Sequence, residues 1–292
     1  MLTNFEKRFY MVRIITDSTC DMALEELEQL NVEMLPLTVR FGDEIYRDGI
    51  DLSHKEFYEK LEMAEELPQT SQINPAEFEA KYREIINSGD DIVSIHIGGK
   101  LSGTLQSANI AADMVDSSRI YCVDSYSASF GMTMIIKMAV RMRDAGKSAK
   151  EIAQECAKVA KRARIVAIVS TLKYLKMGGR LSSGSAFIGE MLGIKPVALV
   201  SDGEVSIIGK ARGERAALEM MKRFIAEHKV DYNFGVAFGH SNALENLYKK
   251  MEYFKKAFPK MRECSSFISD LGPVVGTHIG PGLFAVGYIE AE

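Results

Sequence analysis

Residues able to bind an anion occur at four polar segments of the sequence, three of which contain glycine. Two carry hydroxyl donors, Thr70 in a Thr-Ser-Gln segment and Ser102 in Gly-Gly-Lys-Leu-Ser-Gly-Thr. The other two carry Arg180, after a Gly-Gly pair, and His278, in Gly-Thr-His-Ile-Gly-Pro-Gly. Hydroxyl, guanidinium and imidazole groups can all hydrogen-bond to a carboxylate, and free N–H groups at a helix start attract negative charge. The segments therefore indicate an anion site, although each also fits an ordinary helix cap or surface turn.

Known catalytic signatures are incomplete in this chain. Residues 203–211 resemble a phosphate-binding loop, but five residues instead of four separate the two glycines, and an alanine replaces the hydroxyl that would bind magnesium. No Gly-x-Ser-x-Gly elbow, His-Glu-x-x-His motif or His/Cys cluster is present, so neither a metal site nor a catalytic site is expected. One alternative stays open, a hydrolase whose triad is formed by Ser102, His278 and either Asp17 or Asp124.

Composition limits the class of protein. The 292 residues are 47% hydrophobic and 26% charged, which is enough for a buried core and for two domains. The net charge of -4 includes no basic block, so nucleic acid is not an expected partner. The four cysteines are widely spaced, as in reduced cytosolic proteins. Glu6, Lys7 and Arg8 near the N-terminus, with no apolar run of 18 residues, predict a cytoplasmic protein without stable membrane insertion.

The candidate residues must be positioned by the surrounding secondary structure, which begins as an α/β pattern. Short β-branched runs alternate with longer periodic segments, and the first strands are expected at residues 12–16, 34–39, 92–97 and 120–123. Ser53 and Ser148 begin capping boxes, and Asn74 precedes a proline at a third helix start. The polar residues 16–19 are expected to cap a helix near Asp21. This half is interpreted as a Rossmann-like α/β domain over residues 1–164.

From about Arg164 the pattern predicts an α+β domain with a mixed or antiparallel sheet, over residues 165–292. Its strands are expected at residues 165–169, 195–200, 205–210, 233–238, near 265 and at 283–289, and its helices at 214–228 and 243–256. The Asp-Gly pair at 202–203 favours a tight hairpin turn. Gly178 is expected to end a short helix, Thr70 to lie on a loop, and His278 to lie on a strained turn.

Taken in order, the polar segments resemble one family, the DegV proteins, whose better-understood members are fatty-acid-binding subunits of bacterial fatty acid kinase. The resemblance covers nearly the whole chain and rests on Thr16-Asp17-Ser18-Thr19, Pro36-Leu37, Tyr46-Arg47-Asp48-Gly49, Thr70-Ser71-Gln72, Leu101-Ser102-Gly103-Thr104, Val123-Asp124-Ser125, Gly178-Gly179-Arg180, Ile194-Lys195-Pro196, Gly276-Thr277-His278 and Gly280-Pro281-Gly282. Each motif is weak alone, but their shared order is specific. The chain departs from many relatives at Gln69, at Gly98-Gly99 and at Ser170, where an acidic residue is common.

The resemblance implies a two-domain DegV-like fold that holds one long-chain fatty acid. The carboxylate would lie near the domain junction and the tail in an apolar tunnel. By position, Thr70 and Ser102 match the hydroxyls that bind the carboxylate, and Arg180 and His278 match polar residues around it. No cofactor is implied apart from this bound ligand. A carrier for some other carboxylic acid is the alternative.

The resemblance also implies a partner, a separate ATP-dependent fatty acid kinase subunit that phosphorylates the bound carboxylate. This chain would then be a carrier that presents its substrate and shields the acyl phosphate, without catalysing a reaction itself. Lys210 and Arg212 follow a predicted strand and are candidates to meet an acidic kinase surface, although a solvated strand end explains them equally simply.

Overall fold

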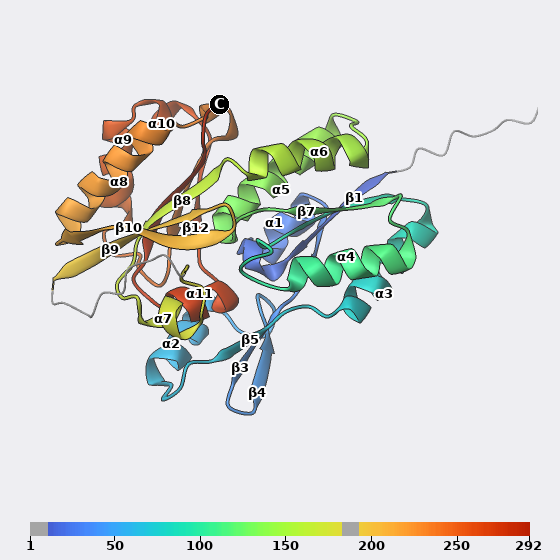
Figure 1. Cartoon of the computed structure of the whole chain (residues 1–292), viewed down its shortest axis with the longest axis horizontal. Helices are drawn as coiled ribbons and strands as arrows, with labels where there is room; N and C mark the ends of the chain where they lie inside the picture. The colour runs from blue at the N-terminus through green and yellow to red at the C-terminus, as the bar shows by residue number, and fades with distance from the viewer. Residues whose placement is uncertain (1–10, 183–192) are drawn as a thin grey trace, which may run out of the picture.

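The computed structural model describes residues 11–182 and 193–292, and its first half is built around a parallel sheet (Figure 1). The strand order is β2-β1-β6-β7, with β1 Val12–Asp17, β2 Val32–Leu35, β6 Asp91–His96 and β7 Ile120–Asp124. One face carries α3 Pro75–Ser88 and α4 Thr104–Val115, and the other carries α1 Leu24–Gln29, α5 Ser129–Asp144 and α6 Ala149–Ala160. Because parallel strands end at one edge, their polar turns gather there.

The second sheet is mixed and has the strand order β10-β9-β8-β13-β11-β12. Its strands are β8 Ala163–Ile168, β9 Ile194–Ser201, β10 Glu204–Arg212, β11 Val236–His240, β12 Ser266–Asp270 and β13 Phe284–Ile289. One face packs against α8 Glu214–His228, α9 Leu247–Ala257 and α10 Lys260–Glu263. The opposite face meets α5, which also contacts β1 and β6, so α5 lies between the two sheets.

A third, smaller group of elements lies beside both sheets. It contains the antiparallel sheet β4-β3-β5, with β3 Thr38–Phe41, β4 Glu44–Arg47 and β5 Gln69–Ser71. Its helices are α2 His54–Met63, α7 Lys173–Met177 and α11 Pro273–Ile279. Helix α11 comes from the end of the chain yet packs on α2, α7, β3 and β5. This contact joins distant parts of the sequence around one site.

The predicted fold class is confirmed, as are its main local signals. Ser53, Asn74 and Ser148 each form a capping box with the glutamate three residues later. Asp202 and Gly203 both have positive φ, of 53° and 75°, as a tight turn between antiparallel strands requires. The second sheet starts with β8 close to the predicted boundary, while the division into separate domains at residue 164 stays a prediction.

Three expected elements were wrong in detail. Residues 34–39 are not one strand, because Pro36 and Leu37 form a corner between β2 and β3, which belong to different sheets. No helix begins near Asp21, which has a left-handed φ of 54°; a 3-10 turn at Ser18–Cys20 precedes it, and α1 starts only at Leu24. Residues 233–235 are outside β11, which begins at Val236 after a second 3-10 turn at Tyr232–Phe234.

Corrections also concern the site residues. Thr70 lies on strand β5 instead of a loop, and His278 lies in the last turn of α11 instead of a strained turn. Gly178 does end α7, as expected, but its φ of −74° is ordinary, and the left-handed C′ residue is Gly179, with a φ of 66°. No helix in the described residues is long and apolar enough to cross a bilayer.

Candidate functional site

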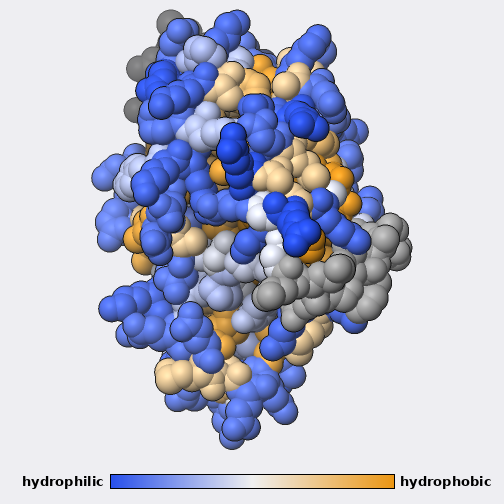
Figure 2. Space-filling view, turned by 90° about the vertical axis from the view of Figure 1, so that its left-hand side faces the viewer, coloured by the Kyte–Doolittle hydropathy of each residue, from blue (hydrophilic) through white to orange (hydrophobic). Residues whose placement is uncertain are grey.

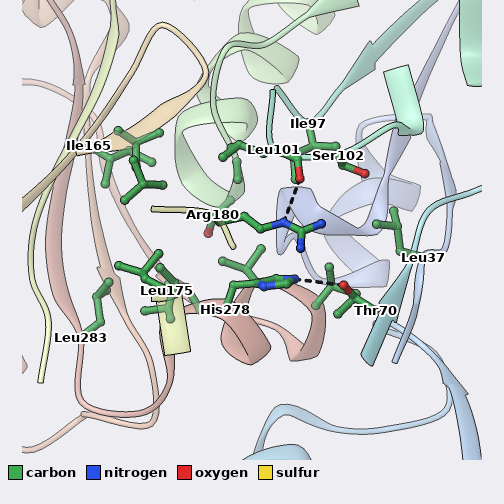
Figure 3. Close-up of a pocket in the computed structure, with 18 of the residues that line it drawn as sticks. Leu37, Thr70, Ile97, Leu101, Ser102, Ile165, Leu175, Arg180, His278 and Leu283 are labelled. Atoms are coloured by element: carbon green, nitrogen blue, oxygen red, sulfur yellow. Dashed lines mark hydrogen bonds between the residues drawn. The ribbon is translucent and has the colours of Figure 1, made fainter. Parts of the chain in front are cut away.

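The four candidate residues Thr70, Ser102, Arg180 and His278 all line one cavity of about 180 Å³ (Figure 3). Strand β5 supplies Thr70, the turn before α4 supplies Ser102, the residues after α7 supply Arg180, and α11 supplies His278. The cavity therefore lies where the first sheet, the second sheet and the small sheet meet. The folded chain brings together all the residues that the sequence singled out as an anion site.

Thr70 and His278 contact each other directly. Thr70 Oγ1 lies 3.0 Å from His278 Nε2, so the two groups share a hydrogen bond across 208 residues of sequence. Burial and the nearby Arg180 charge lower the pKa of His278 to about 4. The imidazole is therefore neutral at pH 7, and its Nε2 can either donate to or accept from the threonine hydroxyl.

Gly178 has its own role beside His278. A Cβ atom at position 178 would lie only 2.2 Å from His278 Nδ1. Since the backbone φ of Gly178 suits any residue, the need for glycine comes from the close imidazole ring and not from helix termination. This reason depends on a contact between α7 and α11 that the local sequence does not reveal.

Ser102 and Arg180 are held mainly through the backbone. Ser102 Oγ accepts a hydrogen bond from the Thr104 N–H at 3.2 Å and lies 2.9 Å from Thr104 Oγ1. Arg180 Nε donates to the Leu101 carbonyl at 3.3 Å, and its Nη1 donates to the Gly178 carbonyl at 2.5 Å. The guanidinium thus bridges α7 to the turn that carries Ser102.

The remaining walls of the cavity are largely apolar. In Figure 3, Ile165, Leu175 and Leu283 lie on one side of the polar groups, while Leu37 lies on the other side, near Thr70. Three neighbouring strands add Ala167, Ala198, Val200 and Val205, and the residue after β8 adds Val169. Helix α11 adds Val274, Val275 and Ile279. A small polar end joined to apolar walls suits an amphipathic acid. The sequence alone does not identify the apolar wall residues. Hydrophobic periodicity predicts which side chains are buried, but it does not predict which of them border a cavity.

The described residues do not assemble the alternative Ser-His-Asp triad. Asp17 Oδ2 lies 3.0 Å from His96 Nδ1, and both residues are fully buried in the first sheet. Asp124 instead accepts hydrogen bonds from backbone N–H groups of its own loop and the loop after β6. His278 Nδ1, the atom that an orienting carboxylate would contact, has no hydrogen-bond partner in the described chain.

Known proteins match this chain along nearly its whole length. A family model described as "Uncharacterised protein, DegV family" matches residues 11–291. This chain belongs to the DegV family. A DegV domain-containing protein of Caldanaerobacter subterraneus subsp. tengcongensis is 33% identical over 285 residues, which is 96% of this chain and 99% of the relative. The resemblance expected from the motifs is confirmed.

Solved DegV structures have the same fold. A DegV family protein from Thermus thermophilus, described by its fatty acid binding, is 30% identical with a TM-score of 0.84 over 96% of this chain and 100% of that chain. DegV from Bacillus subtilis, described as a fatty acid binding protein, is 31% identical with a TM-score of 0.83 over 97% and 100% of the two chains. This chain therefore shares its overall fold with these two family members.

In this DegV chain, two carboxyl groups hold the start of α11 from behind the cavity wall. Asp21 Oδ1 accepts a hydrogen bond from the Gly272 N–H at 3.0 Å, and Asp48 Oδ1 accepts one from the Val274 N–H at 3.4 Å. Burial and the charge of Asp48 raise the pKa of Asp21 to about 8, and burial raises the pKa of Asp48 to about 6. The pair therefore keeps a proton at pH 7.

Four further side chains lie around this carboxyl pair. His54 Nδ1 lies 3.3 Å from Asp270 Oδ2, and His240 Nδ1 lies 3.0 Å from Asp270 Oδ1. Although burial opposes it, contact with His240 and His54 lowers the pKa of Asp270 below its usual range. Tyr58 donates its hydroxyl hydrogen to the Leu271 carbonyl at 3.0 Å. Residues from the first half of the chain therefore hold the segment that leads into α11 in place.

A basic groove lies on another face of this DegV chain, between β10 and α8. Its exposed cations are Lys210, Arg212, Arg215 and Arg223. Within residues 11–182 and 193–292 none of these four side chains forms an ion pair. Figure 2 views the molecule from the side of β9, β10 and α8 and shows hydrophilic residues over most of that face. The described residues contain no group of His, Cys, Asp and Glu side chains suited to a metal ion.

Proposed function

We propose that this DegV-family chain binds a long-chain fatty acid, with its carboxylate near Thr70, Ser102, Arg180 and His278 and its tail along the apolar walls. The observation that carries the proposal is that all four polar residues open into a cavity walled by the inner face of the second sheet. Two solved relatives described as fatty-acid-binding proteins support it. The location we propose is the cytoplasm.

The energetics favour a lipid ligand over a small carboxylic acid. A tail of about fifteen methylenes, buried at about 0.8 kcal/mol each, gains roughly 12 kcal/mol before the entropy of binding is subtracted. The head-group site can therefore be weak. Neutral His278 and the hydroxyls of Thr70 and Ser102 leave carboxylate oxygens less tightly held than a bidentate arginine clamp would.

We further propose that the carrier presents this carboxylate to an ATP-dependent fatty acid kinase subunit and then shields the acyl phosphate. A loosely held carboxylate keeps an oxygen able to attack phosphorus, which suits presentation more than catalysis by this chain. The exposed cations Lys210 and Arg212, together with Arg215 and Arg223, form a surface of the right charge for an acidic partner.

The first experiment is mass spectrometry of ligand released from denatured protein that was purified from bacterial cells. A long-chain fatty acid is expected, and added palmitate or oleate should raise the melting temperature of delipidated protein. Release of a different carboxylic acid, with no effect of palmitate or oleate on the melting temperature, would contradict the proposal.

A second experiment tests the head-group assignment. Joint replacement of Thr70 and Ser102 by alanine should reduce kinase-dependent phosphorylation far more than fatty-acid affinity, because the tail supplies most of the affinity. The matched control is Ser117→Ala, which removes an exposed hydroxyl on the loop after α4. Equal loss of affinity and phosphorylation in the double variant would mean that the carboxylate lies elsewhere.

A further inference from the structure

The inner face of the second sheet carries a row of small residues, which we call the trough, that extends beyond the cavity. Across four neighbouring strands the paired residues on this face are small, and their order is Gly239 on β11, Ala285 on β13, Ala167 on β8 and Ala198 on β9. Ala167 and Ala198 line the cavity, whereas Gly239 and Ala285 do not. Something else must therefore fill the trough over β11 and β13.

The side chain that fills this end is Phe130, from the first turn of α5. A Cβ atom at Gly239 would lie 2.1 Å from Phe130 Cε1, and one at Gly287 would lie 2.6 Å from Phe130 Cδ2. The ring therefore rests directly on the backbone of β11 and β13. Phe130 is 1% exposed and is also one of the residues that line the cavity.

Phe130 has no room to move away from the cavity. The two glycines already bring the sheet backbone as close to the ring as it can come, and α5 is held between the two sheets. Close-packed interiors yield poorly to added volume. The trough is thus divided into a part that is open, over β8 and β9, and a part closed by one aromatic ring.

From this arrangement we propose that Phe130 is the stop that limits the length of the acyl chain, an inference that rests on the proposed function. A chain that advances along the trough gains about fourfold in affinity for each methylene that reaches apolar wall. Once its terminal methyl meets the Phe130 ring, a further methylene gains nothing and displaces packed atoms. Affinity plotted against chain length should rise and then stop rising at one length, which we call the break.

The test is to move this break in both directions. Affinities of delipidated protein would be measured for saturated fatty acids graded from dodecanoate to docosanoate. Phe130→Ala opens the end over β11 and β13, so the break should shift to longer chains, with about fourfold higher affinity per added methylene beyond the wild-type limit. Gly287→Ala adds a methyl group beneath the ring and pushes it toward the cavity, so the break should shift to shorter chains.

The matched control is Phe238→Leu, which shortens a fully buried aromatic residue of β11 that faces away from the cavity, toward α8 and α9. It should lower thermal stability without moving the break, which separates a loss of packing from a change of cavity length.

A break at the wild-type length in both Phe130→Ala and Gly287→Ala overturns the inference while the proposed function stands. If Phe130→Ala does not fold, Gly287→Ala decides alone. Failure of every fatty acid to bind wild-type protein would instead refute the proposed function.

Discussion

Replacing Asp21 by Asn should remove much of the pH dependence of stability that the carboxyl pair under α11 creates. In the folded chain, burial and the charge of Asp48 raise the pKa of Asp21 to about 8, from 3.8 for an exposed aspartic acid. The folded protein thus binds a proton that the unfolded chain has already released. Its stability is greatest in acid and falls as the pH rises toward about 8.

The magnitude follows from linkage. While one proton remains bound only in the folded state, the free energy of unfolding falls by about 1.4 kcal/mol per pH unit. Between about pH 6 and pH 8 the wild type should therefore lose roughly 3 kcal/mol, or about 5 °C of melting temperature for a chain of this size. Asn at position 21 keeps an oxygen acceptor for the Gly272 N–H and has no proton to lose.

The assay is thermal or denaturant unfolding at several pH values in one buffer series at constant salt. Asp21→Asn should give a flatter profile and exceed the wild type at pH 8. The control is Asp43→Asn, at the exposed turn between β3 and β4, which should leave the wild-type profile unchanged. Parallel profiles for wild type and Asp21→Asn would show that the carboxyl pair holds no proton, and the reasoning would be refuted.

Three other changes test separate parts of the structure. Gly178→Ala should displace the ring of His278 and raise its imidazole pKa above about 4 in an NMR titration, and an unchanged pKa would contradict the close contact. Lys210→Glu combined with Arg212→Glu should slow phosphorylation by the kinase most at low salt and leave fatty-acid occupancy unchanged; an unaltered rate would remove both residues from the interface. Tyr58→Phe should cost about 1 kcal/mol of unfolding free energy by removing the bond to the backbone before α11, a loss that urea titration would detect.

Local signals in the sequence predicted most of the elements that surround the site. The capping boxes at Ser53, Asn74 and Ser148 depend only on residues within one helical turn, so they could be found without the fold. The same holds for the hairpin at Asp202 and Gly203. The hydroxyls, Arg180 and His278 were singled out by residue type and turn context, and the fold brought them to one cavity.

Long-range contacts explain what could not be predicted. In the sequence, Gly276 and its neighbouring glycines favour a turn, but the segment is helix α11. A Cβ atom at Gly276 would lie 2.6 Å from Phe57 Cε1 and 2.8 Å from the Tyr58 hydroxyl oxygen. Glycine there serves close packing of α2, which lies about 215 residues earlier. Glycine is required at position 178 for the same reason, because the His278 ring lies close to its backbone. In the sequence, a glycine that is required by a distant contact cannot be told from a glycine that is required by a turn.

The position of β13 has a consequence for biosynthesis. This strand, Phe284–Ile289, lies between β8 and β11, so the sheet behind the cavity has a gap until the last strand arrives. A nascent chain that ends before residue 284 would expose two unpaired strand edges, which are sites for chaperone binding or for wrong pairing with other chains. Its apolar inner face would also lack Ala285. Loading of the proposed fatty acid should therefore require β13 to be in place, and chains that stop before residue 284 should be the form most prone to aggregate.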